Sequence, residues 1–342
     1  MPRPNGNIRV TCVGEAFCTF IEAKAPQRVK TELNVFPIIL QALAGLCLFL
    51  YAVNVMGDTL KELAGDRMKQ FLQRFTKNPA TGILTGTVAT TLLDSSSVVI
   101  IMVLTLVNAN LITSLESFGV IMGANIGTTI SSQLIALDIA DYAPILLFVG
   151  LLVSVIGKNE TRHQVGRVIF AIGLVFFGLW TMDTAVEPLK DYKPFYDWIQ
   201  RLDTPIEGVL VGGLLTLLIQ SSSATVGIAI VLASQGLIPT STGIAIMLGA
   251  EIGTCSDTLL AVIGRSKDAI RAGVFHLAFN IVCVMLGVLF IHQFSAVVEW
   301  ISAGAPAGRK IANAHMLFNV LGVVVFAWFI PIFHRTLTAM IR

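Results

Sequence analysis

A duplicated polar motif inside apolar sequence is the feature that most constrains how this chain can fold. Three consecutive serines occur twice, once as Asp94-Ser95-Ser96-Ser97 and once as Gln220-Ser221-Ser222-Ser223. Each copy is followed at the same distance by a second motif, Gly123-Ala124-Asn125-Ile126-Gly127-Thr128 or Gly249-Ala250-Glu251-Ile252-Gly253-Thr254. Both motifs recur at an offset of 126 residues, and 18 of the 59 aligned pairs in 79–137 and 205–263 are identical. Duplicated, Gly-interrupted segments in a hydrophobic chain are typical of a transporter built from internal repeats.

Composition indicates an integral membrane protein. Charged residues make up 13% of the 342 residues and hydrophobic residues 55%, with a mean hydropathy of +0.79. Soluble domains contain about 25% charged residues. The net charge of +2 reflects basic residues placed between apolar segments, so nucleic acid is not an expected partner. The five cysteines show no Cys-x-x-Cys spacing, so the sequence predicts neither a disulfide framework nor a zinc site.

Seven apolar stretches are candidates to cross a bilayer, which takes about 20 residues. They are residues 36–56, 116–137, 142–157, 165–182, 242–264, 269–292 and 311–333. The expected organisation is an N-terminal tail (1–35), a first transmembrane repeat (36–157), a second transmembrane repeat (165–292) and a C-terminal transmembrane helix (311–333).

Two further apolar stretches are interrupted by the serine triplets. Residues 80–93 and 98–109 flank the first triplet, and 206–219 and 224–234 flank the second. Helical legs of this length span roughly 18–21 Å, too little for a bilayer core of ~30 Å. We therefore predict two re-entrant hairpins with polar tips, the alternative being one long kinked helix in each repeat. Three crossings per repeat would invert the second copy, so the predicted fold is all-α, with two inverted-topology repeats containing re-entrant hairpins and broken helices.

The serine triplets are the first candidate site. Each triplet directly precedes an apolar helical leg, where a serine can cap the orphan amides of the helix N-terminus. Exposed amides and the helix dipole at such an end attract anions. Two facing tips would surround a small oxyanion with the hydroxyls of Ser95, Ser96, Ser97, Ser221, Ser222 and Ser223. The alternative is that these serines only cap hairpin ends and allow close helix packing.

The Gly-rich motifs are a candidate cation site. Unwound backbone carbonyls with hydroxyl, amide and carboxylate oxygens are ligands that Na⁺ prefers. The candidate cation-binding residues are Asp94, Asn125, Thr128, Thr129, Gln220, Glu251, Thr254, Ser256 and Asp257. The alternative is that glycines four residues apart serve helix packing alone.

Carboxylates within apolar segments argue for coupling to a cation. A carboxylate at the bilayer centre costs about 2.5–3.5 kcal/mol on insertion scales, and Asp94, Glu251 and Asp257 all carry one. No lysine or arginine occurs in 78–157 or 202–264, so a bound anion would need helix dipoles and a cation for balance. The alternative is that these carboxyls are protonated or lie close to water.

Two histidine–asparagine pairs recur on the late apolar stretches. His276 with Asn280, and His315 with Asn319, are each four residues apart and therefore share one face of a helix. We expect these pairs to form hydrogen bonds between helices. Proton coupling through a histidine is the alternative function.

The doubled triplet and the doubled Gly-rich motif resemble the type II sodium/phosphate cotransporter family, including its bacterial members. The resemblance covers roughly residues 36–333. It implies sodium-coupled symport of inorganic phosphate by a multi-pass protein of the cell membrane, the inner membrane in bacteria. It also implies that residues 95–97 and 220–223 form the phosphate- and sodium-binding tips, supported by Asn125, Thr128, Thr129 and Thr254.

Two positions depart from the family pattern. Asp94 stands where the family usually has Gln, and Glu251 where it usually has Asn, so each neutral amide is replaced by a carboxylate. The expected partners are phosphate, Na⁺ as the coupling ion, membrane lipid and a second copy in a homodimer, with no other cofactor and no enzymatic activity. The alternatives are a symporter for another small anion, a proton-coupled transporter, a membrane-embedded serine-dependent enzyme, and a non-transporting sensor or scaffold.

Overall fold

The duplicated segments form the same set of helices twice. The computed structural model describes residues 34–341 apart from 138, 158, 193 and 195–203. In the first repeat α3 (Pro79–Leu93), α4 (Ser96–Asn108) and α5 (Ser114–Ile135) surround the first triplet. Their counterparts are α9 (Pro205–Ile219), α10 (Ser222–Ser234) and the consecutive pair α11 (Thr240–Gly253) and α12 (Cys255–Ala261). Every outer boundary is displaced by 126 residues, the offset seen in the sequence.

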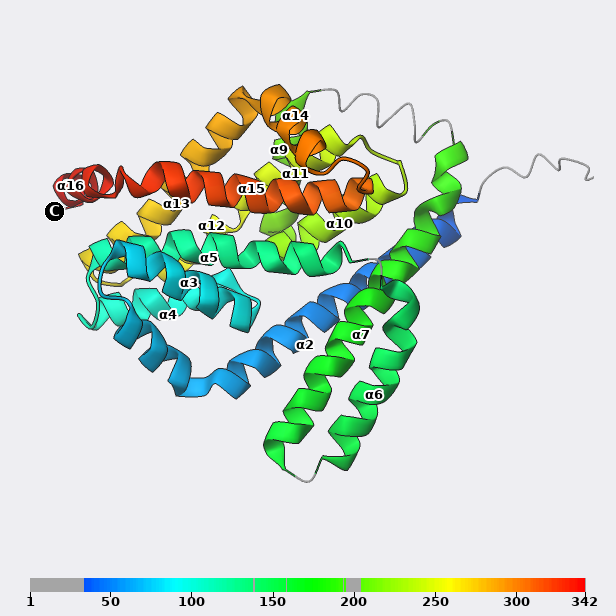
Figure 1. Cartoon of the computed structure of the whole chain (residues 1–342), viewed down its shortest axis with the longest axis horizontal. Helices are drawn as coiled ribbons and strands as arrows, with labels where there is room; N and C mark the ends of the chain where they lie inside the picture. Colours follow the sequence, from blue (N-terminus) through cyan, green and yellow to red (C-terminus); the bar gives the residue numbers. More distant parts are fainter. Residues whose placement is uncertain (1–33, 138, 158, 193, 195–203, 342) are drawn as a thin grey trace, which may run out of the picture. The chain divides into compact units, whose positions relative to one another are not determined.

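The remaining helices flank these two sets (Figure 1). They are α2 (Val35–Phe75), the 3₁₀ turn η1 (Ala140–Tyr142), α6 (Ala143–Ile156), α7 (Glu160–Val186), the 3₁₀ turn η2 (Glu187–Asp191), α13 (Lys267–Leu289), α14 (Ile291–Ile301), α15 (Ala307–Ala327) and α16 (Ile330–Met340). Helices and turns account for all the regular structure in the described part of the chain, as the sequence predicted.

Close backbone contacts show that α3 and α4 form a hairpin. A methyl group on Gly119 would lie 2.0 Å from the carbonyl oxygen of Pro79, and one on Gly123 would lie 1.9 Å from that of Ile83. Helices α3 and α5 therefore run side by side in the same direction from the same level. Because α4 connects the end of α3 to the start of α5, it must run back toward that level. The hairpin prediction is confirmed, and a single long kinked helix is not what forms.

The second repeat uses the same contacts. A methyl group on Gly212 would lie 1.9 Å from the carbonyl oxygen of Ile246, and one on Gly249 would lie 2.0 Å from that of Val209. Only glycine permits backbones to approach this closely, as at small-residue interfaces of membrane helices. The glycines of the Gly-rich motif thus pack α5 on α3 and α11 on α9.

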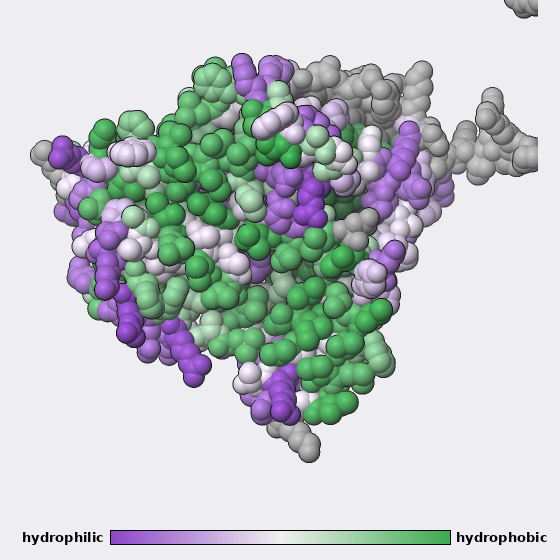
Figure 2. Space-filling view, viewed as in Figure 1, coloured by the Kyte–Doolittle hydropathy of each residue, from purple (hydrophilic) through white to green (hydrophobic). Residues whose placement is uncertain are grey.

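The lengths and surfaces of the helices fit a bilayer. Five helical segments are long and apolar enough to cross a membrane, or six if α5 and α6, which are bent by 78°, form one span; only the described residues were considered. Large apolar side chains are exposed, such as Leu218 at 77% and Ile263 at 74%. Hydrophobic residues dominate the face in Figure 2, with hydrophilic residues mostly at its margins. These features define a multi-pass membrane protein.

Some predicted boundaries differ from the observed ones. The stretch 311–333 is not one helix, because α15 ends at Ala327 and α16 begins at Ile330. Pro331 explains this break, since proline has no amide hydrogen and disfavours helical backbone in the preceding residue. Helix α2 continues well past residue 56, with a non-helical residue at Gly65 (φ 50°). Residues 1–33 of the predicted tail 1–35 lie outside the described residues, and the opposite orientation of the two repeats stays a prediction.

Candidate functional site

Both hairpin tips turn in the same way. The residue that ends the first leg has left-handed backbone angles, φ 52° and ψ 28° at Asp94 and φ 56° and ψ 34° at Gln220. The next residue, Ser95 or Ser221, is extended and caps the second leg. The Ser95 Oγ accepts a hydrogen bond from the Val98 amide at 3.3 Å, and Ser221 makes the equivalent bond at 3.2 Å. The predicted role of the first serine as an N-cap is confirmed.

The two tips line one cavity. Its volume is about 150 Å³, roughly ten times the space that a cavity needs to hold one water molecule. Residues 94–97 of the first tip and 220–223 of the second line it, together with Thr128, Thr254 and Val98. Segments that lie 126 residues apart in sequence therefore meet around a single small polar space.

Helix α2 supplies a wall of the cavity that sequence reasoning missed. Asn54 and Asp58 lie one helical turn apart and line the cavity with Val53 and Gly57. Their signal in the sequence was a polar pair with i, i+4 spacing at the end of the first apolar stretch. That pair lies outside both duplicated motifs, so the repeat comparison did not select it.

The electrostatics of this cavity suit an anion accompanied by a cation. Helices α4 and α10 both begin at the cavity wall, and each presents the positive end of its dipole and the free amides of its first turn. The charged side chains among the lining residues are the carboxylates Asp58 and Asp94, and none of these described residues is basic. An anion held by the helix ends would therefore need a cation to offset the carboxylates.

The serine hydroxyls of the tips have different surroundings. The Ser97 Oγ donates to the Asp257 Oδ2 at 2.9 Å, which joins the first tip to helix α12. The hydroxyls of Ser96 and Ser222 make no side-chain hydrogen bond to another described residue. The Thr254 Oγ1 is buried without a partner in the described structure, although Thr254 lines the cavity. Ser96 and Ser222 thus have hydroxyls available to a bound ion.

Five predicted cation-binding residues do not line this cavity. These are Asn125, Thr129, Glu251, Ser256 and Asp257. The hydroxyls of Thr129 and Ser256 donate to carbonyl oxygens of their own helices at 2.7 and 2.9 Å. The expectation of unwound backbone was wrong for the first Gly-rich motif, because α5 is a regular helix through it and its carbonyl oxygens serve the helix itself. No cluster of three or more His, Cys, Asp or Glu side chains that could hold a metal ion occurs among the described residues.

Helix α13 connects the two repeats through one His–Asn pair. The His276 Nδ1 lies 2.9 Å from the Thr258 Oγ1 in the second repeat. The Asn280 Oδ1 accepts a hydrogen bond from the Asn125 Nδ2 in the first repeat at 2.6 Å. All four side chains are buried.

Helix α15 makes the reciprocal connection. The His315 Nδ1 lies 2.6 Å from the Ser132 Oγ in the first repeat, and the Asn319 Nδ2 donates to the Glu251 Oε1 in the second at 2.7 Å. The His315 Nε2 also lies 2.8 Å from the Glu251 Oε1. Ser132 is equivalent to Thr258, and Glu251 is equivalent to Asn125. Helices α13 and α15 therefore contact the same two positions, each taken from the opposite repeat. The pairs therefore form hydrogen bonds between helices, as expected, in the pattern that a pseudo-twofold axis produces.

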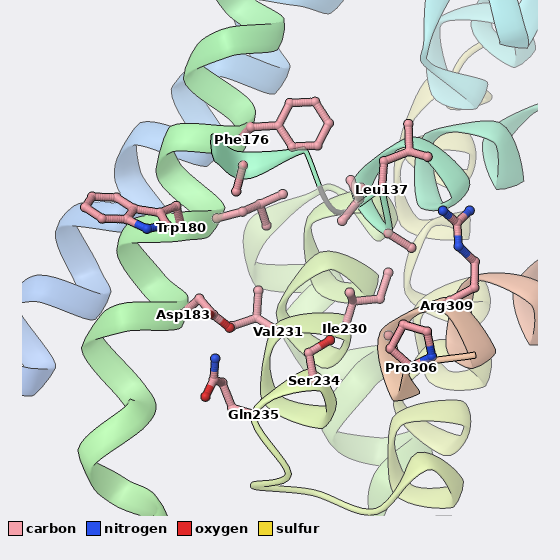
Figure 3. Close-up of a pocket in the computed structure, with 15 residues that line it drawn as sticks. Leu137, Phe176, Trp180, Asp183, Ile230, Val231, Ser234, Gln235, Pro306 and Arg309 are labelled. Carbon is pink, nitrogen blue, oxygen red and sulfur yellow. The ribbon is translucent and has the colours of Figure 1, made fainter. Parts of the chain in front are cut away.

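A second pocket, of about 250 Å³, contains none of the predicted site residues. Figure 3 shows it between α7, the end of α10 and the start of α15. Its polar side chains include Asp183, Ser234, Gln235 and Arg309. The guanidinium of Arg309 donates to the Gln133 Oε1 at 3.0 Å and in Figure 3 lies far from Asp183. The cavity between the tips, which contains both duplicated motifs, is the stronger candidate site.

Two membrane-embedded repeats whose broken helices meet at a polar cavity define the class of secondary transporters. Comparison with known proteins identifies the family. Residues 48–184 and 192–328 each match the model of the Na⁺/Pi-cotransporter family. The chain belongs to this family of phosphate transporters.

Individual relatives agree with this assignment. "Uncharacterized protein YqeW" of Bacillus subtilis (strain 168) is 28% identical over 305 residues, which are 89% of this chain and 98% of the relative. "Putative inorganic phosphate export protein YjbB" of Escherichia coli (strain K12) is 21% identical over 309 residues, and this chain spans only 56% of its length. "Sodium-dependent phosphate transport protein 2B" of Homo sapiens is 30% identical over 133 residues, 36% of this chain and 19% of the relative. No solved structure gives a significant match.

Proposed function

We propose that this protein is a sodium-coupled symporter of inorganic phosphate, with the substrate held between the two serine tips. The observation that carries the proposal is the shared cavity, where two helix N-termini and two serine triplets face each other. Phosphate would accept hydrogen bonds from the hydroxyls and first-turn amides at both tips. Rocking or gating of one repeat against the other would alternate access to the site.

The coupling ion follows from the charge balance of the cavity. Asp58 and Asp94 contribute negative charge, and the anion adds more, while the lining residues offer no basic side chain. Na⁺ bound beside the tips would offset this charge. Of the predicted cation ligands, those that line the cavity or contact a tip stay part of this proposal: Asp94, Thr128, Gln220, Thr254 and Asp257. The other four, Asn125, Thr129, Glu251 and Ser256, form hydrogen bonds away from the cavity and are not proposed as ligands of this Na⁺. We also propose a homodimer surrounded by membrane lipid.

The test is uptake of radiolabelled phosphate into proteoliposomes that contain the purified protein. An inward Na⁺ gradient is compared with an equal K⁺ gradient, and only Na⁺ should drive uptake. Ser96→Ala and Ser222→Ala should each abolish most of the Na⁺-driven uptake while the protein stays folded, because both hydroxyls are free for substrate. Ser154→Ala, in the α6–α7 hairpin, is the matched control and should transport normally. Normal uptake by both tip variants would refute the substrate site.

Proton coupling is a second candidate, favoured by the contact between His315 and Glu251. The buried Glu251 carboxylate lies 2.8 Å from the His315 Nε2, an arrangement that can hold one proton between two groups. An inward pH gradient without Na⁺ distinguishes the candidates. Phosphate uptake under that gradient would favour proton coupling, and its absence, with uptake under Na⁺, would favour the symporter proposed above.

A further inference from the structure

The first hairpin tip is paired with a residue on α5, and at the equivalent positions of the second repeat the carboxylate stands at the other member of the pair. In the first repeat Asp94 is at the tip and Ser131 is on α5, and the Ser131 Oγ donates to the Asp94 Oδ1. The equivalent positions of the second repeat, 126 residues later, are Gln220 at the tip and Asp257 on α12. Each pair therefore contains one carboxylate and one neutral side chain, in opposite order.

The third serine of the opposite tip joins each pair. The Ser97 Oγ of the first tip donates to the Asp257 Oδ2 of the second repeat at 2.9 Å. Its counterpart Ser223 lines a cavity of about 300 Å³ together with Asp94 and Ser131 of the first repeat. Equivalent positions thus come together around both carboxylates, because 94, 131 and 223 line one cavity and Ser97 is bonded to Asp257. Gln220 belongs to the second group as the counterpart of Asp94 in the sequence.

The remaining walls of the first group make its charge costly to leave uncompensated. Apart from Asp94, Ser131, Ser223 and Thr91, the cavity of about 300 Å³ is lined by apolar side chains from α2, α3, α5 and α7 and by Leu137 and Ile139. Apolar surroundings weaken the screening of a carboxylate, so its charge has to be offset by a nearby cation or proton. One carboxylate suits one monovalent cation, two would repel each other, and none would leave the cation without a counter-charge.

We propose that each repeat requires one carboxylate in its tip pair, and that either member of the pair can carry it. This proposal rests on the proposed sodium coupling. It makes Ser131 a specificity-determining position of the first repeat. Asp94 then represents a charge relocated within a pair rather than an extra charge added to the site. The groups 94/131/223 and 220/257/97 each hold one Na⁺.

The test exchanges the members of one pair. Asp94→Gln removes the carboxylate of the first repeat, and Asp94→Gln/Ser131→Asp returns it in the arrangement of the second repeat. Asp257→Ser and Gln220→Asp/Asp257→Ser do the same for the other pair. Two Na⁺ concentrations are measured for each variant. The first gives half-maximal thermal stabilisation of the purified protein without phosphate, and the second gives half-maximal phosphate uptake. Each single variant should raise both by about tenfold or more, and each exchange should restore them to within about threefold.

A matched control separates position from net charge. Asp94→Gln/Ser132→Asp has the same composition as the first exchange, but Ser132 faces His315 rather than the tip, so it should not restore Na⁺ affinity. The proposal is overturned if both exchanges stay as weak as the single variants, or if the Ser132 control restores affinity equally well. The two exchanges lie in separate repeats, so either tests the proposal if the other does not fold. A wild-type protein that binds Na⁺ but takes up phosphate without it would overturn the proposed symport alone.

Discussion

The two repeats share their backbone contacts and differ in their polar side chains. Both hairpins begin and end at equivalent residues, turn through a left-handed residue and pack on a parallel helix through glycine. By contrast, Asn125 corresponds to Glu251, and Ser131 corresponds to Asp257. Duplication has therefore preserved what places the two tips, while the charges around them have diverged. The comparison separates residues that build the cavity from residues that determine what it binds.

The glycine contacts should produce the largest effects, and equally in both repeats. Gly123→Ala and Gly249→Ala place a methyl group 1.9 and 2.0 Å from a backbone oxygen, so the paired helices must separate. We expect a loss of about 3 kcal/mol or more, measured by thermal unfolding in detergent and the yield of monodisperse protein. Gly213→Ala is the control, because its methyl would lie an ordinary 3.5 Å from the Gly249 oxygen and should change stability by less than about 1 kcal/mol. Equal losses in all three variants would contradict the assigned contacts.

The reciprocal asparagines should differ between the repeats. Asn319 donates to a carboxylate of Glu251, whereas Asn280 accepts from a neutral amide of Asn125. Hydrogen bonds to charged groups contribute about 1.5–3 kcal/mol, against about 0.5–1.5 for neutral ones. Double-mutant cycles on thermal stability, with Asn319→Ala and Glu251→Ala in one and Asn280→Ala and Asn125→Ala in the other, should give the larger coupling for the first. Equal couplings would show that the hydrogen bond from Asn319 to the Glu251 carboxylate is no stronger than the neutral bond between Asn125 and Asn280.

A buried threonine pair distinguishes the two hairpins on a smaller scale. The Thr216 Oγ1 donates to the Thr225 Oγ1 at 2.8 Å in the second hairpin. In the first hairpin the equivalents of Thr216 and Thr225 are Thr90 and Val99, and the buried Thr90 hydroxyl has no partner among the described residues. Thr216→Val should cost about 1 kcal/mol, whereas Thr90→Val should be neutral or slightly stabilising, since it removes an unpaired polar group. Thermal unfolding of both variants, with Val99→Thr as the converse change, checks the contrast.

Sequence reasoning located the elements well and the side-chain directions less well. The hairpins, the capping serines and the meeting of the two triplets all follow from a polar break in apolar legs that are too short to span a bilayer. The direction of Asn125 was missed because the Gly-rich motif was expected to be unwound. Two residues of an α-helix are about 200° apart around its axis. Because Gly123 faces α3, Asn125 lies on nearly the opposite face of α5 and points toward α13. Asn54 and Asp58 could be assigned to the cavity only once the path of α2 past the tips was known, and no local sequence pattern encodes that path.

The smallest expected effect concerns one threonine that only the first repeat possesses. The Thr87 hydroxyl lies within hydrogen-bond distance of two oxygens, the carbonyl of Ile83 at 2.9 Å and that of Gly123 on α5 at 3.1 Å. The second repeat has Gly213 at this position, where an added methyl would lie in ordinary contact, 3.5 Å, with the Gly249 oxygen. Gly213→Thr should recreate the contact and stabilise the protein by about 0.5 kcal/mol, because a single proton shared between two acceptors adds little across the interface. Gly213→Val has nearly the same shape without the hydroxyl, so the difference in unfolding temperature between these two variants isolates the hydrogen bond. If valine stabilises as much as threonine, the gain comes from replacing glycine within a helix, and α9 and α11 are held together by packing alone at this position.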